Sequence, residues 1–136
     1  MVLISERGWI MKIKDVMKRK VSVVSENLHL YKALERMKQN NTGILLVKDN
    51  HHVEGVLAVD DVLMRRGINK EKLKKLQVRD VMNPNVHLVY EDQYLLPVRT
   101  MMKEKNITRL IVLNRKNKIT GICTLSDVQG KSINSN

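Results

Sequence analysis

The chain has 136 residues and a formal net charge of +11, from 25 Lys and Arg residues against 14 Asp and Glu residues. No apolar run approaches the ~20 residues that span a bilayer, and the single cysteine excludes an internal disulfide framework and a Cys-x-x-Cys metal cluster. Aromatic residues make up 3% of the chain, which argues against an RNA-stacking surface. We therefore expect a soluble, cytoplasmic protein whose charge favours anionic partners.

Internal repetition is the most informative feature of the chain. The motif Lys14–Met17 recurs as Arg79–Met82, 65 positions further along. Further residues match in order at this spacing, which becomes 66 after one inserted residue. The matching pairs include Val21 and Val86, Leu30 and Leu95, Met37 and Met102, Val47 and Val112, Gly55 and Gly121, and Asp61 and Asp127.

In the first repeat, the β-branched run at 21–24 predicts a strand, and Ser25 provides an N-cap for a helix that ends near Asn40. The continuous apolar stretch at 44–47 predicts a strand buried on both faces. A second strand is expected at 53–59. The pair Asp60-Asp61 then supplies the cap of a short helix.

The linker predicts a short helix at 70–76, followed by a second copy of the same pattern. Its first strand is expected at 86–89, and Asp92 is the expected N-cap of the next helix. Pro97 lies about five positions into that helix, so we expect the helix to bend or to start late. The remaining strands are expected at 107–113 and 119–125, and Ser126-Asp127 begins the last helix.

The sequence thus predicts an α+β protein with two β-α-β-β-α repeats packed sheet to sheet with pseudo-two-fold symmetry. Each repeat alone would have only a marginal core. The expected division is an N-terminal arm at 1–10, repeats at 11–65 and 77–130, a linker at 66–76 and a tail at 131–136.

Each repeat opens with Asp-Val-Met. The second repeat closes with the pattern Gly-h-h-Thr-x-x-Asp, where h is apolar, and the first closes with the same pattern except for Ala58 at the Thr position. This arrangement resembles the cystathionine-β-synthase-type (CBS) domain pair over about residues 11–128, and we expect no attached enzyme or channel domain. The residues that carry the resemblance are Lys14–Met17, Arg79–Met82, Gly55–Val62, Gly121–Val128 and the central strand Ile107–Val112.

The resemblance implies a regulatory homodimer, not an enzyme. Such a module binds AMP, ADP, ATP or S-adenosylmethionine between its repeats, needs no cofactor, and acts on a separate enzyme or transporter. In the second repeat, Asp127 would accept hydrogen bonds from ribose hydroxyls, Thr124 would donate to a phosphate and Arg109 would reach a phosphate. The other contacts implied for this repeat are Thr108, Ile107 and the adenine-facing Val86, His87 and Leu88.

In the first repeat, the corresponding contacts are Asp61, Ser22 and Val23. Ala58 stands where the closing motif has its hydroxyl, so we expect the second repeat to hold the better nucleotide site. The first site is then empty, weaker or used by a ligand without a phosphate at that place.

Simpler interpretations stand beside these roles. Asp127 and Asp61 are also suited to cap the last helix of each repeat, Thr124 to strand packing, and Arg109 to a solvated edge. The adjacent His51 and His52 do not make a convincing metal site, because neighbouring residues of an extended chain point to opposite faces. Cys123 is expected to be an inert core thiol.

Two further functions compete with nucleotide sensing. Basic residues concentrate around Lys18–Lys20 and in the linker, which favours nucleic-acid binding through the phosphate backbone as the secondary alternative. The substitution at Ala58 favours an adaptor with vestigial nucleotide sites. No set of catalytic residues and no phosphate-binding loop is suggested, and a membrane is not an expected partner.

Overall fold

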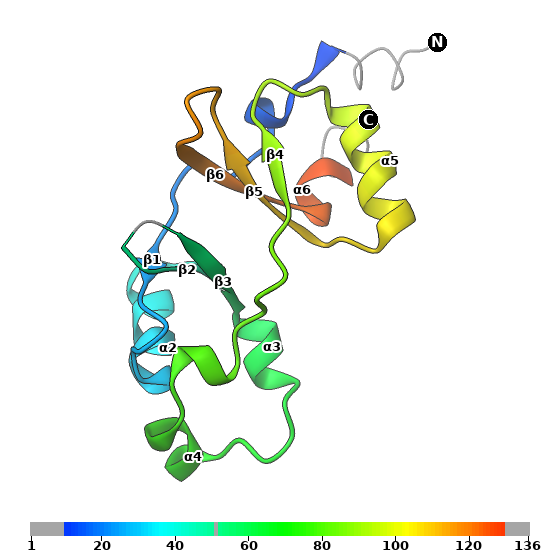
Figure 1. Cartoon of the computed structure of the whole chain (residues 1–136). Coiled ribbons are helices and arrows are strands. Elements are labelled where there is room, and N and C mark those ends of the chain that lie inside the picture. The colour runs from blue at the N-terminus through cyan, green and yellow to red at the C-terminus, as the bar shows by residue number, and fades with distance from the viewer. Residues whose placement is uncertain (1–9, 51, 130–136) are drawn as a thin grey trace. The chain divides into compact units, whose positions relative to one another are not determined.

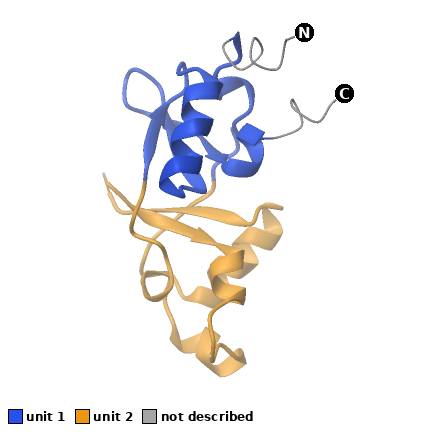
Figure 2. Cartoon of the chain, turned by 90° about the vertical axis from the view of Figure 1, so that its right-hand side faces the viewer, with its two compact units in different colours: residues 1–21, 87–136 blue, residues 22–86 orange. Residues whose placement is uncertain are grey.

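The computed structural model describes residues 10–50 and 52–129. The C-terminal tail, all but the last residue of the expected N-terminal arm, and His51 lie outside the described residues. The described chain forms two compact units, which Figure 2 shows in different colours. We call residues 22–86 the contiguous unit, and residues 10–21 with 87–129 the composite unit.

The contiguous unit contains a three-stranded sheet in the order β1-β2-β3, with β1 parallel and β3 antiparallel to the central strand β2. Its helix α2 and short helix α3 belong to the first repeat, and α4 and the 3-10 helix η2 follow from the linker onward (Figure 1). The elements are β1 (Val23–Val24), α2 (Leu30–Gln39), β2 (Ile44–Lys48), β3 (Val53–Ala58), α3 (Val59–Leu63), α4 (Lys70–Lys75) and η2 (Val78–Asp80).

The composite unit repeats this architecture with a sheet in the order β4-β5-β6 and the same strand directions. Its elements are η1 (Ile13–Asp15), β4 (Leu88–Tyr90), α5 (Leu95–Lys105), β5 (Arg109–Leu113), β6 (Ile119–Thr124) and α6 (Leu125–Gln129). The two antiparallel pairs share one register, because Val47 faces Gly55 as Val112 faces Gly121, and each pair has an irregularity one residue later. The predicted α+β fold with two β-α-β-β-α repeats is confirmed.

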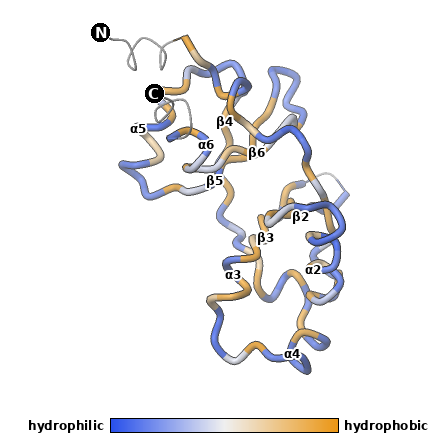
Figure 3. The backbone as a smooth tube through the Cα atoms, turned by 180° about the vertical axis from the view of Figure 1, so that it is seen from behind, coloured by the Kyte–Doolittle hydropathy of each residue, from blue (hydrophilic) through white to orange (hydrophobic). Residues whose placement is uncertain are grey.

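The central strands β2 and β5 have their three middle residues buried, as expected for strands covered on both faces. Hydrophobic and hydrophilic residues alternate along α2 and α5, as Figure 3 shows. The apolar faces of these helices contribute Leu30, Ala33 and Met37 to one core and Leu95, Val98 and Met102 to the other.

The segments that open the two repeats, residues 13–18 and 78–83, each pack against the opposite repeat, and we call them the opening segments. In the composite unit, the Ile13 N–H donates to the Gln93 carbonyl at 2.9 Å and the Lys14 N–H donates to the Glu91 carbonyl at 2.9 Å. In the contiguous unit, the Val78 N–H donates to the Leu28 carbonyl at 2.9 Å in the corresponding way. The compact units therefore divide the chain differently from the repeats, because each repeat completes its fold with the other's opening segment.

Two glycines make room for these segments. A Cβ on Gly121 would lie 2.6 Å from the Lys18 carbonyl oxygen, and a Cβ on Gly55 would lie 2.6 Å from the Asn83 carbonyl oxygen. Such approaches are too short for any side-chain carbon. The residue after each glycine forms an isolated β-bridge with the segment, so the glycines of the closing motifs fix the opening segments in place.

Several helix starts differ from the prediction. The helices α2 and α5 begin after His29 and Tyr94, so Ser25 and Asp92 are not their N-caps. Both side chains are engaged elsewhere: the Ser25 hydroxyl accepts from the Asn27 N–H, and Asp92 binds Arg115. The late start of α5 places Pro97 in its first turn, where a missing N–H costs no helical hydrogen bond.

The short helices α3 and α6 also start earlier than predicted, directly after Ala58 and Thr124. The carboxylates of Asp61 and Asp127 therefore lie within the first turn of these helices and not at the cap position. An acidic residue is favourable there because the first turn has free N–H groups.

Candidate functional site

The predicted site residues of the second repeat gather at one end of the β4-β5-β6 sheet. Arg109 begins β5 and lies opposite Thr124, the last residue of β6. The preceding residue, Thr108, accepts a hydrogen bond at its carbonyl from the Leu125 N–H at 2.9 Å. Thr108 is exposed, whereas Arg109 and Thr124 are half-buried. The backbone thus places Thr108, Arg109 and Thr124 side by side where β6 passes into α6.

Thr124 and Asp127 form a reciprocal cap around the start of α6. The Thr124 N–H donates to Asp127 Oδ2 at 2.9 Å, and the Asp127 N–H donates to Thr124 Oγ1 at 3.2 Å. This is the geometry of a capping box. Asp127 is therefore not the N-cap of α6, which is Thr124, but its carboxylate takes part in the capping box. The Thr124 hydroxyl uses only an acceptor position in this arrangement, and its own proton is available for donation.

Lys18 completes the cluster and was not among the predicted site residues. Its ammonium Nζ lies 2.7 Å from Asp127 Oδ1. The exposed fractions of the two side chains are 56% for Lys18 and 16% for Asp127. The 109 positions between the two residues leave no local pattern that would pair them. Only the placement of the first opening segment against β6 brings them together.

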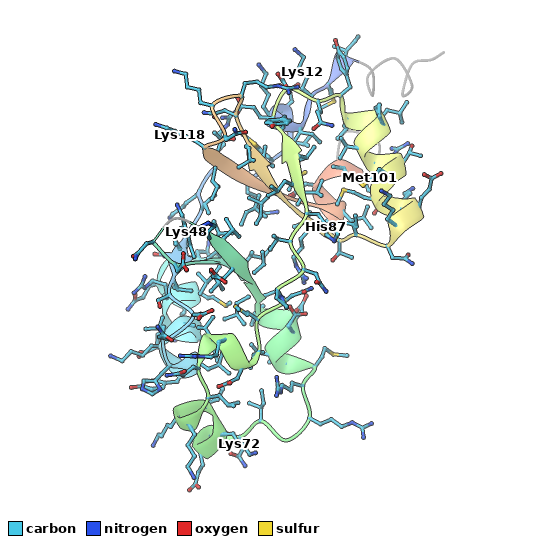
Figure 4. The ribbon with its side chains drawn as sticks, in the orientation of Figure 1. Lys12, Lys48, Lys72, His87, Met101 and Lys118 are labelled. Carbon is cyan, nitrogen blue, oxygen red and sulfur yellow. The ribbon has the colours of Figure 1, made fainter. Side chains whose placement is uncertain are left out.

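The expected adenine-facing residues lie at the same end of the sheet. The His87 carbonyl accepts from the Ile111 N–H at 2.8 Å, and Leu88 then begins β4 beside β5. Figure 4 shows His87 at the entry to β4. Leu88 is 55% exposed at the start of β4. Val86 is half-buried and directly precedes this pair.

Ile107 differs from its neighbours in the predicted set, because it is 7% exposed and packs in the core of the composite unit. Its side chain therefore belongs to the hydrophobic core beneath the cluster and is not exposed to a ligand. The adjacent Thr108 is the residue that faces solvent.

The corresponding end of the β1-β2-β3 sheet in the first repeat has fewer polar side chains. Gly43 and Ile44 occupy the positions of Thr108 and Arg109, and Ala58 occupies that of Thr124. The Val59 N–H donates to the Gly43 carbonyl at 2.8 Å, so the backbone is the same. Asp61 remains in α3, and the position of Lys18 is taken by Asn83. Of the four polar residues Thr108, Arg109, Thr124 and Asp127, the first repeat keeps only the carboxylate.

The two other predicted residues of the first repeat belong to its first strand. The Ser22 carbonyl accepts from the Leu46 N–H at 2.8 Å, and the Ser22 hydroxyl accepts from the side-chain amide of Asn40 at 2.9 Å. Val23 is 44% exposed, and the corresponding Leu88 of the second repeat is exposed as well. Ser22 therefore has a structural partner of its own.

Within residues 10–50 and 52–129, no cluster of three or more histidine, cysteine or acidic residues is arranged to hold a metal ion. His52 lies 3.8 Å from Asp49 in a turn and is exposed. In the same described ranges, no helix has the length and apolar character needed to cross a membrane. Cys123 is fully buried, and this burial raises the pKa of its thiol to about 12.

The basic residues of the linker are exposed on and around α4. Leu73 and Leu76 pack against the core of the contiguous unit, which leaves the lysines of the helix in solvent (Figure 4 labels Lys72). The exposed basic residues of this segment are Arg65, Arg66, Lys70, Lys72, Lys74 and Lys75.

Two copies of one three-stranded α+β unit, with the full polar cluster only in the second repeat, define a tandem-repeat module. A family model of the CBS domain matches the chain twice, at residues 13–67 and 78–132. The chain therefore belongs to the CBS domain family, as the resemblance of its repeats predicted.

Solved structures with the same fold include two CBS modules that contain adenosine ligands. One is the CBS domain of the bacterial CNNM/CorC family Mg²⁺ transporter in complex with ATP, with a TM-score of 0.77, 18% identity and coverage of 93% of this chain and 89% of that chain. The other is a CBS domain pair in complex with 5′-methylthioadenosine and S-adenosyl-L-methionine, with a TM-score of 0.70, 21% identity and coverage of 88% and 93%.

Among curated proteins, a probable arabinose 5-phosphate isomerase of Haemophilus influenzae is 23% identical over 120 residues, which cover 88% of this chain but 36% of the isomerase. The chain spans 28–38% of the length of several curated relatives that it matches. The similarity to these longer proteins thus concerns the CBS portion that they share.

Proposed function

We propose that the second repeat binds an adenosine-containing ligand (AMP, ADP, ATP or S-adenosylmethionine) and that this binding regulates a partner, such as a separate enzyme or transporter. The observation that carries the proposal is the gathering of Thr108, Arg109, Thr124 and Asp127 at one end of the sheet. The adenosine ligands of two CBS modules with the same fold support it.

The chemistry of the four residues assigns their roles. The carboxylate of Asp127 is suited to accept hydrogen bonds from ribose hydroxyls, because hydrogen bonds to a carboxylate are strong. The free hydroxyl proton of Thr124 and the guanidinium of Arg109 are suited to phosphate oxygens, and Thr108 adds an exposed hydroxyl. Leu88 and His87 offer an exposed surface against which an adenine ring would rest.

The first repeat is proposed to bind more weakly or to take a ligand without a phosphate. The loss of polar groups extends beyond Ala58, because Gly43 and Ile44 replace a hydroxyl and a guanidinium. Asp61 retains the ability to hold a ribose, with Ser22 and Val23 at the entry to the sheet. One strong and one weak site per chain is therefore the expected stoichiometry.

Regulation requires that the ligand bind one arrangement of the protein better than another, because equal affinity for both arrangements shifts no equilibrium. We propose that the partner senses this difference. The exposed Leu63 and Met64, 74% and 82% accessible at the end of α3, support self-association as a homodimer. Light scattering of the wild type and of Leu63→Ser tests this part, and a monomeric wild type would contradict it.

The direct test of ligand binding is calorimetry, with thermal unfolding in parallel, against AMP, ADP, ATP and S-adenosylmethionine. A ligand at 100 times its dissociation constant should raise the free energy of unfolding by about 2.7 kcal/mol. No heat and no thermal shift with any of these compounds would overturn the proposal and favour an adaptor with vestigial sites.

A matched pair of variants locates the site. Asp127→Asn removes the charge but keeps a carbonyl that can accept from the Thr124 N–H, so the start of α6 is preserved. Asp61→Asn makes the same change in the first repeat. We expect the first variant to weaken the stronger binding event at least tenfold and the second to leave it unchanged. Equal effects would contradict the assignment to the second repeat.

The exposed basic residues around α4 favour a second candidate function, binding to nucleic acid through its phosphates. A mobility shift at 50 mM and 200 mM salt distinguishes the two functions. Phosphate-dominated binding would collapse at the higher salt, whereas binding that survives with a sequence preference would make nucleic-acid recognition the better interpretation.

A further inference from the structure

The backbone of Lys18 is fixed beside the last strand of the composite unit. Its N–H donates to the Ile122 carbonyl at 2.8 Å, and its carbonyl accepts from the Ile122 N–H at 2.9 Å. Gly121 lets the two chains approach this closely. The start of the Lys18 side chain is therefore set by the fold, and only its four-carbon stem and ammonium are free to move.

Asp127, by contrast, is held in place. Its Oδ2 accepts from the Thr124 N–H, and its Oδ1 accepts from the Lys18 ammonium. Its side chain is only 16% exposed, whereas that of Lys18 is 56% exposed. Of the two partners, Lys18 is the one that can swing into solvent without disturbing the helix.

Of the two corresponding sites, only that of the second repeat has a lysine beside its carboxylate. In the contiguous unit, Asn83 makes the same two backbone hydrogen bonds, in this case with Val56. The Asn83 side chain accepts from the Asn85 N–H and carries no charge. In the composite unit, the residue at this backbone position supplies an ammonium to Asp127. In the contiguous unit, the corresponding residue has a neutral amide.

We propose that Lys18 is a built-in competitor for the ribose-binding carboxylate of the second repeat and thereby selects phosphorylated nucleosides over neutral ones. This inference rests on the proposed function. A ribose that binds Asp127 Oδ1 displaces the ammonium. A phosphate on the same ligand offers the displaced ammonium a new anionic partner, whereas a neutral nucleoside leaves the displacement uncompensated.

The variant that tests this is Lys18→Met, which keeps the backbone hydrogen bonds and a long stem but removes the ammonium. Its matched control is Lys20→Met, which removes the same charge two residues further on, at another exposed position. Calorimetry with adenosine and with AMP is carried out on the wild type and on both variants. Thermal unfolding without ligand checks that all three proteins fold.

We expect Lys18→Met to bind adenosine about twofold to fivefold more tightly, which is the strength of an exposed ion pair, and to bind AMP more weakly. The affinity for AMP divided by the affinity for adenosine should therefore fall in Lys18→Met. The Lys20→Met variant should leave this ratio unchanged. An unchanged or weakened affinity for adenosine in Lys18→Met would overturn the competition, even if AMP binds normally to the wild type. If the wild type binds neither of these compounds and none of ADP, ATP and S-adenosylmethionine, the proposed function itself fails, which is a separate result. A wild type that binds S-adenosylmethionine but no phosphorylated nucleoside would overturn the selection by Lys18 alone.

Discussion

Ile13 and Val78 lie 65 positions apart in the sequence, and each is completely buried in the core of the opposite repeat. Ile13 packs among residues of β4 to α6, and Val78 packs among residues of β1 to α3. The opening segments are therefore structural parts of the two cores and not linkers between them.

Replacing Ile13 with alanine should consequently destabilise the protein by about 2–5 kcal/mol, because it leaves a cavity in a closed core. Ile10→Ala is the matched control, since Ile10 is 73% exposed three residues earlier. Urea unfolding measures both free energies. A loss for Ile13→Ala as small as that for Ile10→Ala would show that the segment is not part of the core.

Gly121→Ala tests the close approach of the first opening segment. The new Cβ would meet the Lys18 carbonyl at 2.6 Å and the Met17 sulfur at 2.8 Å, so backbone must shift. We expect a loss of about 1–3 kcal/mol in the free energy of unfolding. Gly43→Ala is the milder comparison, because its Cβ would meet a Val59 methyl carbon at 3.2 Å. The reverse order of the two effects in thermal unfolding would contradict this geometry.

The ion pair between Asp92 and Arg115 predicts a specific titration. Hydrogen bonds from Arg115 lower the pKa of Asp92 below its usual value of 3.8. The stabilisation from this pair is thus complete above pH 3.8 and is lost as the pH falls through the lower pKa of the folded protein. In Arg115→Gln, carboxyl NMR should show the Asp92 pKa returning upward, whereas Arg115→Lys should retain part of the shift. An unchanged pKa of Asp92 in Arg115→Gln would contradict the ion pair.

Burial of Cys123 predicts a thiol that does not react in the folded protein. Its pKa is raised from 9.0 to about 12, first by desolvation and then by the charge of Asp127. A thiol reagent at pH 8 should label the protein only in urea. Keeping the thiol neutral favours folding below pH 9, and this preference is lost as the pH rises toward 12. Rapid labelling of the folded protein at pH 8 would contradict the burial.

The repeat pattern predicted the order of strands and helices along the chain and the family, because periodicity and matching motifs are local properties of the sequence. The N-caps of α2 and α5 were predicted wrongly. Ser25 and Asp92 have suitable side chains, but the chain uses them in a turn and in an ion pair. Local propensity identifies candidates for a cap, and tertiary contacts decide which of them is used.

The exchange of opening segments could not be predicted in the same way. The motifs at Lys14–Met17 and Arg79–Met82 are nearly identical, so each is compatible in sequence with either core. For the same reason, the contact between Lys18 and Asp127 could not be predicted from the repeat pattern. The difference between Lys18 and Asn83 was visible in the alignment of the repeats, but its meaning depends on which carboxylate lies nearby.

The exchange also sets the order in which the protein can form as it is synthesised. Residues 22–86 are complete once the ribosome has passed them. Ile13 and Met17, made earlier, have no core until β4, β5 and β6 follow. The first opening segment, which is made before residues 22–86, is therefore buried only after them. Its contacts span most of the chain, and such distant contacts slow folding.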